Sequence, residues 1–293
     1  NSPVTLTDVN GEGPGGGEDE ESSECESNNS CAFQWTPSKE STSIKLNIPQ
    51  FYTTNLNHNN REIRDEYEKS ILDGDISFTA NFGWVDNSHA FKNSKREELY
   101  IGVEELWRQL ENEPSSDQIY LGYYSVNYKQ DVPFGNISVG IERQYLVKSD
   151  LSIEERKSVA LAIFQDVSMA FEQMQALDPT SGSSFEPADL PSNMLRFYQI
   201  VGGVNKSEIK ELIKPLLPEK SLEVYRSYPG TFTNSQYKNK SFNPRYFDTP
   251  YTSESFGTPD KLNTIKPSSI SSIREFGKAN LILFDQDMIK IRR

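Results

Sequence analysis

The sequence predicts an α+β fold: a single mixed domain with a long buried central helix, a small antiparallel sheet and a long irregular C-terminal segment. Between residues 159 and 177 the apolar side chains recur at steps of three and four and cover nearly every side of a helix. The runs 119–129 and 136–147 are rich in Tyr and β-branched residues, which favour paired strands. Strands and helices do not alternate as they do in Rossmann-type folds.

Signals at both ends delimit the central helix. Ser152 and Glu155 form a capping box, in which the Ser152 hydroxyl accepts an amide of the first turn and Glu155 reaches back to the Ser152 amide. Asp178-Pro179 ends the helix because proline disfavours helical geometry in the preceding residue. One narrow polar line remains on the helix: Gln165, Ser168 and Glu172.

The remaining predicted elements are shorter. Helices are expected at 61–72, 96–111, 194–200, 206–216 and 268–276. Strands are expected at 44–48 and 76–84, and the apolar runs in 281–291 predict a hairpin. The segment 225–259 has many aromatic residues and little periodicity, so we expect it to be irregular and ordered by its aromatic side chains.

Composition separates a tail, residues 1–40, from a globular domain, residues 41–293. The tail is rich in Gly, Glu and Ser and holds nine acids and one base, which is typical of a flexible spacer. No cluster of Lys and Arg suits nucleic acid, and no apolar run approaches the roughly 20 residues of a membrane span. Cys25 and Cys31 close a small disulfide loop or are two free thiols. Because the chain begins at Asn1, we expect that a leader was removed or the sequence trimmed.

The first candidate site is the pair Asp86 and His89, at the end of a predicted strand. Histidine exchanges protons near neutral pH without help from its surroundings. If residues 86–89 form the first turn of a helix, both side chains lie on one face. The carboxylate then fixes the imidazole tautomer, or both groups bind a metal. The alternative is that Asp86 only caps the helix and His89 is a hydrogen-bonded helix residue.

The second candidate is Glu172 with the proline-stiffened loop that follows the central helix. A carboxylate in a buried helix must be paired or its pKa rises, and a raised pKa suits a general acid or base. The alternative is that Glu172 lies at a solvent-facing seam. Four loop residues are predicted to bind substrate: Ser184, Glu186, Asp189 and Asn193. Alternatively, Asp189 or Ser192 caps the next helix.

Several stretches together resemble a family of exported bacterial proteins, catalogued as domain of unknown function 4056. They are Tyr145–Arg156, the helix through Phe171-Glu172, the loop and helix Phe185–Tyr198, and Gly83-Trp84-Val85-Asp86 followed by His89. The resemblance covers roughly residues 81–198 and does not extend to the long C-terminal part. It implies an exported protein, often membrane-anchored, and no established reaction.

The leading hypothesis is an extracytoplasmic hydrolase-like enzyme that acts on an envelope polymer or lipid. Asp86 orients His89, and Glu172 is a second acid or base. The protein is expected to be secreted or to lie in the periplasm or outer envelope, tethered through its N-terminal tail. The competing hypotheses are a non-catalytic secreted binding module for a glycan or envelope component, and a structural envelope protein. The sequence leaves the metal, other cofactors, the substrate and the oligomeric state open, and it contains no Gly-x-Ser-x-Gly, Walker or His-Glu-x-x-His motif.

Overall fold

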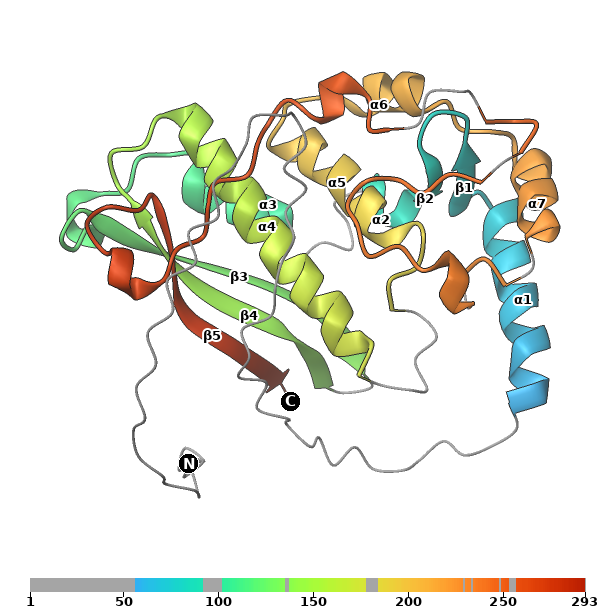
Figure 1. The fold of residues 1–293 in the computed structure, drawn as a ribbon, viewed down its shortest axis with the longest axis horizontal. Helices are drawn as coiled ribbons and strands as arrows, with labels where there is room; N and C mark the ends of the chain where they lie inside the picture. Colours follow the sequence, from blue (N-terminus) through green and yellow to red (C-terminus); the bar gives the residue numbers. More distant parts are fainter. Residues whose placement is uncertain are drawn as a thin grey trace, which may run out of the picture. The chain divides into compact units, whose positions relative to one another are not determined.

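A computed structural model describes residues 56–91, 102–134, 137–177, 184–228, 230–232, 234–247, 249–252 and 257–292. All of them belong to one compact unit, residues 52–293. The predicted tail, its two cysteines, the strand at 44–48 and the first part of the helix at 96–111 lie outside the described residues. The described part confirms the α+β class, with helices and two small antiparallel sheets (Figure 1). None of its helices has the length and apolar character needed to cross a membrane.

The chain order of the elements is as follows. The α-helices are α1 (Leu56–Leu72), α2 (Asn87–Ala90), α3 (Val103–Leu110), α4 (Ile153–Gln175), α5 (Asp189–Ile200), α6 (Lys206–Ile213) and α7 (Pro218–Ser227). The strands are β1 (Ile76–Thr79), β2 (Gly83–Asp86), β3 (Tyr123–Phe134), β4 (Ile137–Lys148) and β5 (Leu281–Arg292). Short 3₁₀ turns are η2 (Ser116–Gln118), η3 (Ser235–Tyr237), η4 (Asp260–Leu262) and η5 (Ile273–Glu275).

The larger sheet has the order β3-β4-β5, and α4 packs against β3 and β4 (Figure 1). The predicted hairpin of β3 and β4 is confirmed, with Tyr124 opposite Val147. The predicted C-terminal hairpin is wrong, because 281–292 is one strand that pairs with β4 throughout. A register shift between Glu142 and Gln144 takes up the polar residues near Asp285, so the strand continues instead of turning.

The central helix α4 is confirmed. Its capping box is present: the Ser152 amide donates to Glu155 Oε2 at 2.8 Å, and the Glu155 amide donates to Ser152 Oγ at 3.4 Å. Its apolar side chains belong to the sheet core, a cluster that also includes side chains of β3, β4, α3, α5 and α6. The described helix ends at Gln175, and Asp178-Pro179 lies outside the described residues.

A second cluster, the aromatic core, joins α1, the β1–β2 hairpin, α7 and the irregular segment after it. Its largest rings are Phe78, Trp84, Tyr225, Phe232 and Phe247. The Trp84 and Phe232 rings lie 5.1 Å apart, edge to face. The expectation that 225–259 is ordered mainly by aromatics is therefore confirmed beyond the end of α7.

The β1–β2 hairpin corrects the single strand expected at 76–84. The Thr79 hydroxyl accepts the Phe82 amide and donates to the Gly83 carbonyl, both at 2.9 Å, which fixes a tight turn. Gly83 has a φ of +70°, and a Cβ there would lie 2.4 Å from the Arg245 carbonyl oxygen, so only glycine fits. The hairpin lies between the two cores, with Phe82 in the sheet core and Phe78 in the aromatic core.

Two further differences concern helix boundaries. Helix α5 begins at Asp189 rather than at 194, because Pro191 lies in its first turn, where proline is tolerated. The helix expected at 268–276 is only the turn η5, because the Ser271 amide donates to the Leu281 carbonyl instead. Helix α7 was not predicted; it begins with Pro218 at its first position.

Candidate functional site

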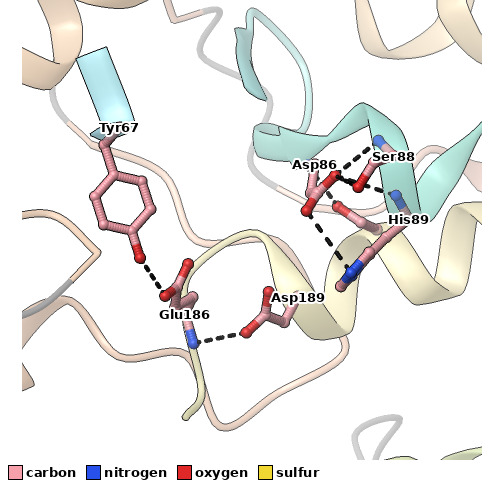
Figure 2. Close-up of polar contacts among 7 residues, drawn as sticks. Tyr67, Asp86, Ser88, His89, Glu186 and Asp189 are labelled. Carbon is pink, nitrogen blue, oxygen red and sulfur yellow. Dashed lines mark hydrogen bonds and ion pairs between the residues drawn. The ribbon is translucent and has the colours of Figure 1, made fainter. Parts of the chain in front are cut away.

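Three segments that are distant in sequence meet at one place, where the two cores adjoin. Figure 2 shows two of them, the end of β2 with α2 and residues 184–192 at the start of α5. The third is the C-terminal turn of α4, where Glu172 accepts the Phe185 amide. The Asp86 amide donates to the Ser192 hydroxyl at 2.9 Å, which joins β2 directly to α5. Ser192 is fully buried and does not cap α5, so the expectation that Asp189 or Ser192 caps that helix is wrong.

Of the two roles that the sequence suggested for Asp86, the helix cap is present, whereas no hydrogen bond from Asp86 fixes the tautomer of His89 in the described structure. One carboxylate oxygen caps α2, because it accepts the Ser88 amide at 2.7 Å and the His89 amide at 3.1 Å. The other oxygen lies 3.8 Å from His89 Nε2, close enough for electrostatic attraction and too far for a hydrogen bond. The His89 side chain is 40% exposed, and its Nδ1 is enclosed without a hydrogen-bond partner in the described structure.

Glu172 is buried rather than at a solvent-facing seam. Its Oε2 accepts the Phe185 amide at 2.5 Å, and burial raises the pKa of Glu172 to about 7 against the lowering effects of that hydrogen bond and of Lys238. Phe185 has a φ of +54°, which is rare for a bulky residue, and its carbonyl accepts the Asn239 amide at 2.8 Å. Glu172 and Asn239 therefore hold a strained residue from both sides.

Glu186 is the neighbouring buried acid. Its Oε1 accepts the Tyr67 hydroxyl of α1 (Figure 2). Burial raises the pKa of Glu186 to about 7; Tyr67 and Lys238 lower it, while Glu172 and Asp86 raise it further. Burial and then Glu186 also raise the pKa of Tyr67, so the phenol keeps its proton and donates it.

Asp189 completes the acid cluster, which we define as Glu172, Glu186 and Asp189. It accepts the Glu186 amide at 3.1 Å and is partly exposed. Burial raises the pKa of Asp189 well above its usual value, and the charges of Glu172, Glu186 and Asp86 raise it further. Because these groups act on each other's pKa values, they occupy one electrostatic environment and titrate as a coupled set.

Lys238 is the cation that faces the acid cluster. It is half-buried, and its Nζ donates to the Phe232 carbonyl at 2.9 Å. Burial lowers the pKa of Lys238, while Glu186, Asp189 and Glu172 oppose that effect in this order. No pattern in the sequence marks Lys238, which lies in the irregular segment, or Tyr67 of α1 as part of this site.

The other predicted site residues lie apart from these contacts. Ser184 and Asn193 are half-buried, and within the described residues neither side chain hydrogen-bonds to the acid cluster. Ser168 donates nothing to Glu172; its hydroxyl instead accepts Gln130 Nε2 at 2.7 Å. No set of three or more His, Cys, Asp or Glu side chains in the described ranges is arranged to hold a metal ion.

The site therefore combines a half-exposed imidazole with carboxyl groups whose pKa values are raised by burial. Comparison with protein-family models, with curated proteins and with solved structures found no match for this chain. The geometry of the site and the sequence thus carry the functional argument.

Proposed function

We propose that the chain is a hydrolase-like enzyme that acts on an envelope polymer or lipid by general acid–base catalysis at the acid cluster and His89. One observation carries the proposal: the charge of Asp86, which lies 3.8 Å from the half-exposed imidazole of His89, acts on two buried carboxyl groups with raised pKa values, Glu186 and Asp189. A general acid works best when its pKa lies near the working pH, and burial achieves this for a carboxyl group.

The solvent exposure of each side chain indicates which group acts as the general acid and which as the general base. Asp189 is the member of the acid cluster that reaches solvent most, so it donates the proton to the leaving group. His89 Nε2 removes a proton from water, and the Asp86 carboxylate, 3.8 Å away, faces the imidazolium that forms. Glu172 and Glu186 support Asp189, because their charges favour its protonated form.

The location outside the cytoplasm is part of the same proposal. The acidic, glycine-rich stretch 1–40 is typical of a spacer between an anchor or export signal and a folded domain. A half-exposed His89 with an unpartnered Nδ1 favours an acid–base site over a binding module, in which we would expect this histidine to be buried and satisfied.

The test uses the full chain and three substrate classes: nitrophenyl glycosides, nitrophenyl acyl esters and dye-labelled peptidoglycan, from pH 5 to 8. We expect hydrolysis of at least one class. His89→Asn and Asp189→Asn should each lower kcat by roughly 10²- to 10⁴-fold, the usual contribution of a general acid or base. His58→Asn, which changes the other histidine, should keep the rate.

Two results would contradict the proposal. One is the absence of turnover with all three classes; if a glycan still bound, the chain would be a binding module. The other is a full rate in His89→Asn and Asp189→Asn, with their folding verified by circular dichroism.

A further inference from the structure

Arg156, in the second turn of α4, is an enclosed cation without a partner. The residue is 8% exposed, and its Nε and Nη1 are enclosed. In the described part of the chain neither nitrogen donates to a carboxylate, a carbonyl or any other acceptor. A guanidinium remains charged at every physiological pH, so burial cannot remove its charge.

The acids nearest in sequence are all engaged elsewhere. Their partners are Lys148 for Asp150 at 3.1 Å, Lys157 for Glu154 at 2.8 Å, and the Ser152 amide for Glu155 at 2.8 Å. They therefore leave the Arg156 charge without a counterion. The N-terminal end of the 23-residue helix α4 adds positive potential at the same place.

Tyr124 of β3 places a second unused donor beside Arg156. Its hydroxyl is enclosed and has no hydrogen-bond partner in the described structure. The Arg156 charge acts on this hydroxyl, because it lowers the pKa of Tyr124 against burial, which raises that pKa to about 12. Strand β3, which carries Tyr124, packs against α4, which carries Arg156, so the two donors belong to neighbouring elements.

We propose that Arg156 and Tyr124 form a binding site for a small oxyanion, a phosphate or carboxylate group. A guanidinium and a phenol supply donors of the kind that bind such groups through charge-assisted hydrogen bonds. Binding replaces an uncompensated buried charge with an ion pair.

This oxyanion site is separate from the acid cluster. Arg156 and Glu172 lie at opposite ends of α4, and their 16 intervening steps span roughly 24 Å of helix at about 1.5 Å per residue. The oxyanion site and the proposed hydrolytic reaction can therefore fail independently.

The test is a titration of the full chain with sodium phosphate or sodium acetate, at constant ionic strength in chloride, followed by calorimetry and by Tm. A ligand that binds only the folded state raises Tm in a saturable way, whereas salt exclusion gives a continuing, unsaturated rise. We expect saturable binding of at least one anion, and comparison of the two titrations identifies a phosphate or a carboxylate site.

Four variants sharpen the test. Arg156→Met should abolish saturable binding, and Arg156→Lys should weaken it because lysine lacks the planar fork. Tyr124→Phe should weaken binding by roughly tenfold, since one hydrogen bond to a charged group is lost. Arg226→Met, which removes an exposed arginine paired with Glu68, should bind as the original chain does.

The proposal is overturned if the original chain shows no saturable binding of either anion, or if Arg156→Met or Tyr124→Phe binds unchanged. Should Arg156→Met fail to fold, Arg156→Lys and Tyr124→Phe still decide the question, because both keep the size and nearly all the packing of the replaced side chain.

Discussion

The two ends of α4 bury ionisable groups of opposite charge, and they differ in how the cost of burying that charge is reduced. At its C-terminal end Glu172 is enclosed, accepts the Phe185 amide and has a pKa raised to about 7. At its N-terminal end Arg156 is enclosed, and its Nε and Nη1 have no partner in the described chain. A carboxyl group can take up a proton and lose its charge, whereas a guanidinium cannot. At the acid end Glu172 can therefore take up or release a proton near neutral pH. At the other end the charge of Arg156 can be compensated only by a bound anion.

The largest expected effect is that substitutions at the two ends of α4 change the free energy of unfolding in opposite directions. In urea unfolding at pH 6, without phosphate or carboxylate buffers, Glu172→Ala should lower the free energy of unfolding by about 2–4 kcal/mol. It leaves a cavity and an unpaired Phe185 amide. Arg156→Met should be neutral or stabilising, because replacing an unpaired buried charge with an apolar side chain removes a desolvation penalty.

Glu172→Gln is the matched control at the acid end, because its amide oxygen can still accept the Phe185 amide. It should lose less stability than Glu172→Ala. A strong destabilisation by Arg156→Met would show that its guanidinium is compensated, and the contrast between the two ends would disappear.

The pH dependence of Tm tests the acid end directly. The pKa values of Glu172 and Glu186 in the folded chain, about 7, exceed the ordinary value of 4.5. Between those pH values the folded state holds more protons on these two groups, so their contribution to stability is fully present below pH 4.5 and is lost as pH rises to about 7. Calorimetry should show Tm falling by roughly 5–10 °C from pH 5 to pH 8.

The double variant Glu172→Gln/Glu186→Gln should flatten this dependence, because neither amide titrates. A Tm that rises from pH 5 to pH 8 in the original chain would mean that the two carboxyls are ionised in the fold. The acid–base proposal would then lose its general acid.

A smaller effect is expected where the acid end is attached to β2. Ser192→Ala removes the acceptor of the Asp86 amide and should lower the free energy of unfolding by about 1–2 kcal/mol. Ser227→Ala is the control: its hydroxyl bonds the Glu223 carbonyl on an exposed helix face, so the change should stay within about 0.5 kcal/mol. If urea unfolding gave the same loss of free energy of unfolding for both variants, the buried hydrogen bond between β2 and α5 would stabilise the fold no more than an exposed one.

The smallest effect concerns the phenol behind the acid cluster. Tyr67→Phe removes the hydrogen bond that lowers the pKa of Glu186, so this pKa should rise further. Carbon-13 NMR titration of the glutamate carboxyls measures it, and stability at pH 8 should fall by about 1 kcal/mol. A lower pKa of Glu186 in the variant would reverse the assigned role of Tyr67.

Local signals in the sequence were enough to predict α4, the β3–β4 hairpin and the Asp86–His89 pair. The capping box of Ser152 and Glu155 fixes a helix start within four residues, and a hairpin needs only neighbouring strands and a short connection. Helix periodicity left open whether Glu172 is buried or lies at a solvent-facing seam, and the structure decided for burial. The single strand predicted at 76–84 is wrong because the Thr79 hydroxyl bonds Phe82 and Gly83 and turns the chain into a hairpin, which the alternation of apolar and polar residues does not indicate.

By itself, then, the sequence determined the fold class, the central helix and most acids of the candidate site, because each rests on contacts among near neighbours along the chain. Only the tertiary structure decided that Tyr67 and Lys238 join those acids and that two nitrogens of Arg156 have no hydrogen-bond partner among the described residues. Residue spacing does not predict contacts between side chains that are a hundred residues apart. Whether a buried polar group has a partner depends on how distant segments pack, so the sequence alone does not reveal it.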